Sequence, residues 1–243
     1  YVTLTHGKNN LICDSSYEKP ESRLWHGLSP FGREVVAEMN RLGIMVDLAH
    51  VSDEAFDQAL ALTQAPPIAS HSSCRHFTPG FERNLDDARI RALAAKGGVL
   101  QINFGSSFLT AAANKNAIDG SLAQAAFVKE KGVAENSPEA KAFEEKWKQE
   151  NPLPRANLDD VVAHIDHVVA IAGIDHVGLG SDFDGVGDSL PYGLRDVSMY
   201  PNLFARLLER GYREADIEKI AGGNLMRVWR EAERVAREMR GKP

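Results

Sequence analysis

The sequence predicts an α/β protein built on a parallel sheet. Short apolar segments alternate with helical segments along most of the 243 residues, which is the pattern of right-handed βαβ units. The apolar segments are mostly continuous, as expected of strands buried on both faces. Three of them end in histidine and one ends in aspartate. Because the carboxyl ends of parallel strands meet at one edge of a sheet, we expect these four side chains to lie together there.

Capping residues set the expected bounds of the elements in the first half. Ser29-Pro30 and Ser52 are typical helix starts, and Gly43 is a typical helix stop. The expected strands cover residues 2–6, 44–50 and 67–71, and the expected helices cover residues 29–42 and 52–62.

The second half continues the same order within what we expect to be a single domain over residues 1–243. Asn84 and Asn157 predict the caps of two helices, which end at 95 and 172, and strands are expected over 99–104 and 177–182. Two or three amphipathic helices follow Tyr200. Residues 109–155 interrupt this order. A structureless loop of that length would be unusual, so we expect a helical insertion that serves as a lid or an oligomer contact.

Composition excludes several classes of protein. A hydrophobic content of 43% can fill a core, and a net charge of -6 argues against a nucleic-acid surface, which needs clustered Lys and Arg. No apolar run reaches the roughly 18 residues of a transmembrane segment. The two cysteines, Cys13 and Cys74, exclude a disulfide framework but leave a single bridge open.

The strand-end histidines favour a metal site. His50 and His71 end consecutive strands, so right-handed winding makes them neighbours, and neutral imidazoles bind zinc through nitrogen. Asp182 can be a third ligand or a general acid or base. His6 can be a ligand or a donor to a developing oxyanion. His164, in the middle of a helix, has a structural interpretation.

Two arginines can hold a substrate carboxylate, because a guanidinium group pairs with it bidentately. Arg75 and Arg83 both lie in the loop after His71, and their spacing does not choose between them. Asp184 precedes Gly185 and is typical of a turn.

Several segments closely resemble the membrane (renal) dipeptidase family. They are 1–6 (YVTLTH), 27–32 (GLSPFG), 40–52 (NRLGIMVDLAHVS), 70–73 (SHSS), 83–84 (RN), 180–185 (GSDFDG) and 196–201 (DVSMYP). The resemblance covers nearly the whole chain except residues 109–155. It implies a (β/α)8 TIM-type barrel with two zinc ions at its carboxyl end. It also implies a dipeptidase that works through a metal-bridged hydroxide and often accepts a D-residue at the C-terminal position.

The resemblance also implies roles for matched residues. His50 and His71 correspond to two ligands of one zinc ion, and His6 to the histidine that polarises the scissile carbonyl. Arg83, with Asn84 beside it, corresponds to the arginine that binds the terminal carboxylate of the substrate. Asp182 corresponds to the aspartate that exchanges protons with the bridging water and the leaving amine.

Part of the family pattern has no counterpart here. The His-x-Asp pair of the first barrel strand and the bridging glutamate of the third are absent. We therefore expect an incomplete barrel of strands 4–8, with the first three strands and the remaining zinc ligands outside this chain. Two alternatives stay open: a metal-dependent amide, lactone or β-lactam hydrolase, and a non-catalytic barrel fragment that only binds a partner. The compartment, bacterial envelope or cytoplasm, and the assembly, a homodimer included, also stay open.

Overall fold

Five parallel strands form one sheet, in the order in which they occur along the chain. A computed structural model describes residues 1–241. The strands are β1 (Val2–Thr3), β2 (Val46–Asp47), β3 (Ile68–Ser72), β4 (Val99–Asn103) and β5 (Val177–Ser181). β1 and β5 are the two edges of this open sheet. The parallel α/β prediction is confirmed, and the topology is consistent with five consecutive strands of a barrel.

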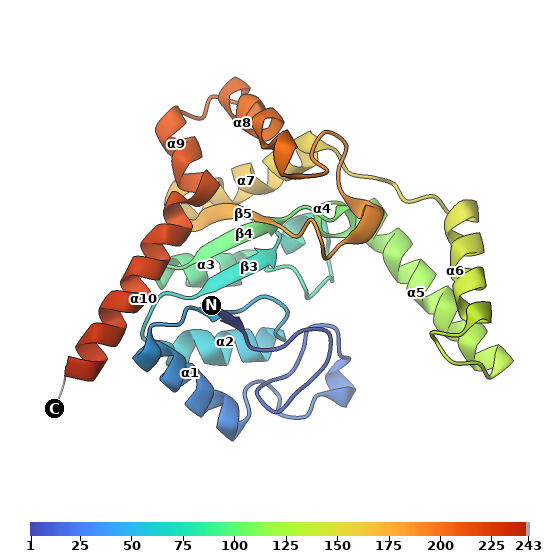
Figure 1. Cartoon of the computed structure of the whole chain (residues 1–243), viewed down its shortest axis with the longest axis horizontal. Helices are drawn as coiled ribbons and strands as arrows, with labels where there is room; N and C mark the ends of the chain where they lie inside the picture. The colour runs from blue at the N-terminus through green and yellow to red at the C-terminus, as the bar shows by residue number, and fades with distance from the viewer. Residues whose placement is uncertain (242–243) are drawn as a thin grey trace.

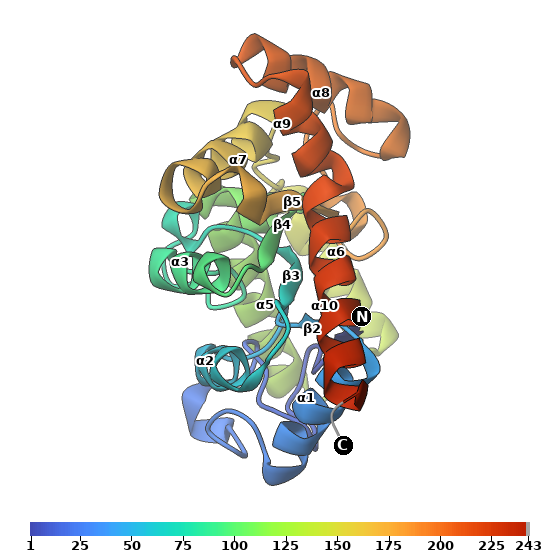
Figure 2. The same cartoon turned by 90° about the vertical axis from the view of Figure 1, so that its left-hand side faces the viewer.

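Helices connect the strands and extend the fold beyond them (Figure 1). The helices are α1 (Pro30–Leu42), α2 (Asp53–Leu62), α3 (Asp87–Ala95), α4 (Ser106–Leu109), α5 (Ala111–Lys131), α6 (Pro138–Glu150), α7 (Leu158–Ala172), α8 (Tyr200–Glu209), α9 (Glu214–Glu218) and α10 (Asn224–Gly241). Figure 2 shows α2, α3 and α7 on one side of the sheet and α10 on the other. None of the helices in residues 1–241 has the length and apolar character that crossing a bilayer requires.

Most helix ends follow the capping chemistry of the sequence. The Ser29 hydroxyl accepts the N–H of Gly32, the Ser52 hydroxyl accepts the N–H of Ala55, and Asn157 forms a capping box with Asp160. The expected cap at Asn84 is wrong. Asp86 caps α3 instead, because its carboxylate accepts the N–H of Arg89. An Asp at this position competes with the nearby Asn for the same role.

The amino ends and the carboxyl ends of the strands face different parts of the structure. α10 packs its Val228, Ala232 and Val235 against Ile68 and Val99, the residues at which β3 and β4 begin. α10 therefore braces the amino edge of the sheet. The polar side chains singled out in the sequence lie at the opposite, carboxyl edge.

Residues 109–155 carry α5 and α6, which project away from the sheet as a helical arm (Figure 1). Within the arm, Phe127 and Phe143 stack at 4.5 Å, and a Cβ at Gly120 would lie 2.9 Å from the Trp147 ring. The two helices therefore pack closely on each other. Arg155 ties the base of the arm to the loop after β5, by donating to the carbonyl of Leu190.

The two cysteines are buried free thiols. Burial raises the pKa of Cys13 to about 12, and it raises the pKa of Cys74 further. Neither thiol is activated as a thiolate at neutral pH.

His164 is a buried histidine of α7 with two backbone partners. Its Nδ1 accepts the N–H of Cys74 at 3.0 Å, and its Nε2 donates to the carbonyl of Leu109 at 3.0 Å. Burial lowers the pKa of His164 to about 4. A proton on Nδ1 would face another N–H group, so the fold requires the neutral ring.

The stability of the fold should therefore fall in acid. The unfolded chain gains a proton at His164 near pH 6.5, whereas the folded chain gains it only near pH 4. Between pH 7 and pH 5 the free energy of unfolding should lose about 2 kcal/mol through this group alone. Urea unfolding at the two pH values measures this loss. The amide of His164→Gln can accept and donate but does not titrate in this range. Its free energy of unfolding should therefore fall by about 2 kcal/mol less between the two pH values than that of the unaltered protein. An identical pH dependence in the variant would contradict the assignment.

Candidate active site

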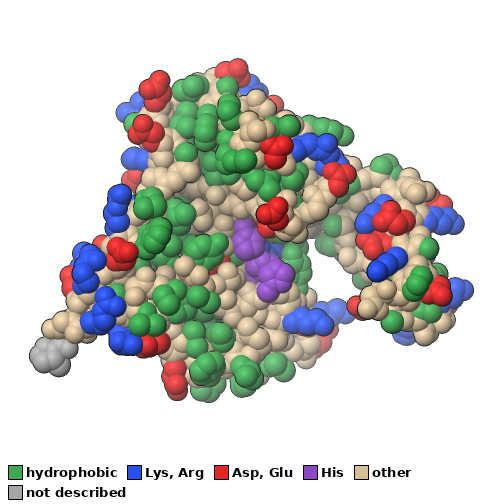
Figure 3. Space-filling view, viewed as in Figure 1, with side chains coloured by type: hydrophobic (Ala, Val, Ile, Leu, Met, Phe, Trp, Pro, Cys, Tyr) green, Lys and Arg blue, Asp and Glu red, His purple; other side chains and the backbone are tan. Residues whose placement is uncertain are grey.

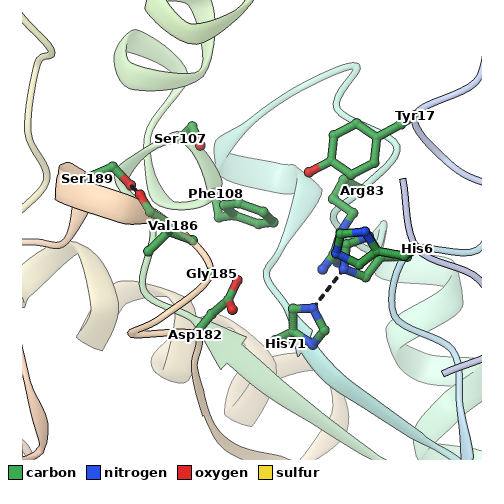
Figure 4. A pocket seen from close by; sticks show the side chains of 11 residues that line it. His6, Tyr17, His71, Arg83, Ser107, Phe108, Asp182, Gly185, Val186 and Ser189 are labelled. Carbon is green, nitrogen blue, oxygen red and sulfur yellow. Dashed lines mark hydrogen bonds between the residues drawn. The ribbon is translucent and has the colours of Figure 1, made fainter. Parts of the chain in front are cut away.

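A pocket of about 360 Å³ opens at the carboxyl edge of the sheet. Figure 3 shows histidine side chains gathered in a hollow near the middle of one face. The pocket is lined by His6, Tyr17, His50, His71, Arg83, Ser107, Phe108, Asp182, Gly185, Val186 and Ser189 (Figure 4). Five of the six residues to which the family resemblance gives a site role therefore line one pocket, and the sixth, Asn84, is not among the lining residues.

The strand ends deliver four of these side chains. His6 and His50 lie three residues beyond β1 and β2, His71 lies within β3, and Asp182 directly follows β5. His50 and Asp182 have positive φ angles of 70° and 62°. Non-glycine residues adopt this region at an energetic cost and are enriched at functional sites. The backbone thus turns sharply where these side chains enter the pocket.

The three histidines are packed ring to ring. Nε2 of His50 lies 2.8 Å from Nε2 of His71, and the ring centres of His6 and His50 are 4.3 Å apart. Burial, and then the positive charge of Arg83, lowers the pKa of His50 to about 2 and also lowers the pKa of His71. His50 and His71 are therefore neutral at pH 7, which is the form that binds metals.

The donor set fits part of a metal site. Two neutral imidazoles turn their Nε2 atoms toward one another, and these are the ligand atoms that zinc and other transition metals prefer. Within the described residues 1–241, however, no third His, Cys, Asp or Glu joins them in a group that could hold an ion. A catalytic zinc usually has three protein ligands. The described residues 1–241 therefore bring together two imidazoles that would suit such a site and not a full set of three ligands.

Asp182 lies across the pocket from the histidines (Figure 4). Its Oδ2 accepts the side-chain N–H of Asn103 at 2.8 Å, and Asn103 is fully buried. A Cβ at Gly185 would lie only 2.1 Å from Oδ1 of Asp182, so the loop can fold over the carboxylate because residue 185 is glycine. Asp184, the neighbouring acid, is exposed.

The structure distinguishes the two arginines that the spacing left equal. Arg75 is engaged outside the pocket, where it pairs with Asp53 at 2.6 Å and donates to the carbonyl of Asn84. Arg83 lines the pocket, as the family resemblance implies.

Arg83 is a buried cation with unused donors. Its side chain is only 2% exposed, Nη1 donates to Oγ of Ser72 at 2.7 Å, and its guanidinium lies 5.2 Å from the ring centre of Phe108. Its Nε and Nη2 have no hydrogen-bond partner. Burial lowers the pKa of Arg83, although the nearby Tyr17, Asp47 and Asp182 oppose this effect. Such a group is ready to receive an anion.

Asn84, which we expected to contact the substrate, directs its side chain to the protein itself. Its amide oxygen accepts the N–H of Ser73, and its amide nitrogen donates to Oγ1 of Thr78 and to the carbonyl of Phe108. Asn84 is fully buried and holds the loop that carries Arg83. Both amide hydrogens of Asn84 and one acceptor position of its oxygen are therefore engaged by the protein itself.

Several lining residues were not found from the sequence. Tyr17 lies in the long loop after His6, with its ring centre 5.9 Å from that of His50. Burial raises the pKa of Tyr17, so its hydroxyl stays a donor at neutral pH. Phe108 and Val186 add an apolar wall. The only sequence signal for Tyr17 was the length of its loop, and none marked the other two.

The sequence of this chain matches a known protein family and several of its relatives. Residues 1–243 match the family model described as membrane dipeptidase (peptidase family M19). The chain is 40% identical over 241 residues to the dipeptidase tcpJ of Claviceps purpurea, covering 99% of this chain and 46% of that protein. It is 37% identical over 243 residues to an uncharacterized dipeptidase of Schizosaccharomyces pombe, covering all of this chain and 49% of that protein. The chain thus spans about half the length of these relatives.

Solved structures of the same kind superpose on the fold. The probable dipeptidase PvdM of Pseudomonas aeruginosa matches with a TM-score of 0.79 and 30% identity, over 96% of this chain and 62% of that one. A metallo peptidase of Rhodobacter sphaeroides, solved with a phosphinate mimic of the dipeptide L-Ala-D-Ala, matches with a TM-score of 0.71 and 27% identity, over 95% of this chain and 55% of that one.

Proposed function

The chain belongs to the membrane dipeptidase family, peptidase family M19, and from this premise we propose that it forms the substrate-binding half of a metal-dependent dipeptidase site. The observation that carries the proposal is Arg83, a buried guanidinium with two unpaired donor atoms that lines the same pocket as the paired imidazoles of His50 and His71. A dipeptide always carries a free carboxylate close to its single peptide bond. An anchor for that carboxylate next to a hydrolytic centre therefore selects dipeptides over longer chains.

His50 and His71 would hold the metal, and nitrogen donors favour zinc. When bound, the metal would lower the pKa of its bound water to near neutral pH, and the metal would also polarise the scissile carbonyl. Within residues 1–241 no further His, Cys, Asp or Glu joins these two imidazoles to complete the ligand set.

The remaining pocket residues handle the substrate and its protons. Arg83 pairs with the terminal carboxylate and so fixes where the peptide bond lies. His6, packed on the ring of His50, donates to the carbonyl oxygen as negative charge develops there. Asp182 accepts the proton of the attacking water and returns it to the leaving amine. Asn103 keeps that carboxylate turned into the pocket.

The proposed substrates include dipeptides with a C-terminal D-residue. Support comes from the Rhodobacter sphaeroides relative, which was solved with a mimic of L-Ala-D-Ala. The test compares hydrolysis of L-Ala-L-Ala, L-Ala-D-Ala and L-Ala-D-alaninamide by the metal-loaded full-length protein. Cleavage of the two dipeptides and not of the amide is expected. Equal cleavage of the amide would instead favour a general amide hydrolase.

Asp182→Asn should lower kcat for dipeptides by on the order of 10²–10⁴-fold with little change in KM, because proton transfer is lost while carboxylate binding is kept. Steady-state kinetics measures both constants. Asp184→Asn, an exposed acid two residues along the same loop, is the matched control and should leave both constants unchanged. A large rise in KM with kcat intact would show that Asp182 binds substrate and does not transfer protons.

A further inference from the structure

A buried carboxylate lies beneath the histidines and has no role in the chemistry described so far. Asp47, at the end of β2, is completely buried and accepts four hydrogen bonds. Its Oδ1 accepts the backbone N–H groups of Ala49 and Ser70. Its Oδ2 accepts the hydroxyl groups of Thr3 and Ser70, each at 2.6 Å. The carboxylate thus links β1, β2 and β3 below the pocket.

The Ser70 hydroxyl connects this carboxylate to His71. Oγ of Ser70 lies 2.6 Å from Oδ2 of Asp47 and 2.7 Å from Nδ1 of His71. A hydroxyl group has one hydrogen, and here that hydrogen goes to the carboxylate, which cannot donate. Oγ must therefore accept at its other contact, so Nδ1 of His71 carries the hydrogen.

A neutral imidazole has one N–H group, so Nε2 of His71 is then a lone pair. This is the atom that faces Nε2 of His50 at 2.8 Å. The hydrogen bonds from Asp47 through Ser70 to His71 thus determine which nitrogen of His71 is available to an ion. Hydrogen bonds to the far nitrogen of a ligating histidine commonly have this effect.

We propose that Asp47 is a positioning residue that acts through Ser70 to hold His71 in the tautomer that can ligate metal before any metal arrives. The metal part of this inference rests on the proposed function, whereas the tautomer does not. His50 has no such partner, because its Nδ1 is buried without a hydrogen bond. The two ligands therefore differ: the tautomer of His71 is set by the protein, and that of His50 is set by what it meets in the pocket.

Asp47→Asn should reverse the chain of hydrogen bonds. The backbone N–H groups of Ala49 and Ser70 can only donate, so the amide oxygen must take the place of Oδ1 and the amide nitrogen the place of Oδ2. Ser70 then accepts from that nitrogen and must donate its own hydrogen to His71. The hydrogen of His71 moves to Nε2, where it blocks the ligand position.

The experiment records long-range ¹H–¹⁵N spectra of the imidazoles in the metal-free full-length protein at neutral pH. We expect an Nδ1–H tautomer of His71 in the unaltered protein, an Nε2–H tautomer in Asp47→Asn and a mixture in Ser70→Ala. Thr3→Val is the matched control: it removes the other hydroxyl on Oδ2 but has no contact with His71, so the Nδ1–H tautomer should persist. An Nε2–H tautomer in the unaltered protein, or an unchanged tautomer in Asp47→Asn, would overturn the inference.

A calorimetric titration with Zn²⁺ alone gives the second readout. Asp47→Asn and Ser70→Ala should bind Zn²⁺ about 10- to 100-fold more weakly than Thr3→Val, which is the usual effect of losing such a partner. Equal affinities in all three variants would overturn the inference. Because neither measurement uses a peptide, failure of the dipeptidase proposal would appear separately, as a lack of turnover with the expected tautomers in place.

Discussion

Replacing His71 by alanine should reduce hydrolysis of L-Ala-D-Ala by roughly 10³-fold or more, because several kcal/mol of transition-state stabilisation leave with the metal. His50→Ala should have the same effect, since its Nε2 atom lies 2.8 Å from that of His71 and both would bind the same ion in the proposed site. Steady-state turnover and metal content of the purified full-length variants measure this result. Both quantities should fall together.

His26→Asn is the matched control for these two variants. His26 is an exposed histidine of the loop after β1 with a φ of 49°, which asparagine also tolerates. Its metal content and turnover should equal those of the unaltered protein. If His71→Ala lost its metal but kept its turnover, the ion would be structural and the dipeptidase mechanism proposed above would be wrong. Full turnover after chelation of the unaltered protein would have the same meaning.

Replacing Arg83 by alanine should raise KM for dipeptides by about 100-fold, because a buried, charge-assisted partner of the carboxylate is lost, an effect of about 3 kcal/mol. Arg83→Lys should recover only part of this loss, since an ammonium group cannot pair bidentately. Activity against L-Ala-D-alaninamide, which lacks the carboxylate, should stay low and equal in all three proteins.

Stability distinguishes this effect from misfolding. Arg83 is buried with two unpaired donors, so its removal should leave the free energy of unfolding unchanged or higher. Denaturant unfolding of the variants measures it. An unchanged KM in a stably folded Arg83→Ala variant would show that the carboxylate is bound elsewhere.

Much of the fold follows from local signals in the sequence. Serine caps, glycine stops and continuous apolar runs predicted the order of strands and helices. The rule that parallel strands share a carboxyl edge then predicted that His50 and His71 would be neighbours. The ring centres of these two residues are 4.8 Å apart. This part of the site could be predicted because it depends only on topology.

Other parts of the site depend on tertiary contacts that have no local signal. Asn84 looked like a helix cap and a substrate contact, yet its amide is spent on Ser73, Thr78 and Phe108. The apolar wall of Phe108 and Val186 comes from α4 and from the loop after β5, which are far apart in the sequence. The choice between Arg75 and Arg83 required the family resemblance, because the spacing of the two residues is equally suitable. Only the folded structure shows that Asp53 already engages Arg75.

The position of α10 has a consequence for how this sequence can diverge. Its brace involves Val228, Ala232 and Val235 at one rim of the sheet, while every side chain of the pocket comes from the other rim or its loops. Mutations that change ligand preference can therefore accumulate without disturbing the packing of α10 on the sheet. Mutations that change this packing leave the pocket geometry unaltered. The packing that stabilises the fold and the side chains that determine specificity thus lie at opposite ends of the same strands. New specificities can therefore arise in such a scaffold while its thermal stability is kept.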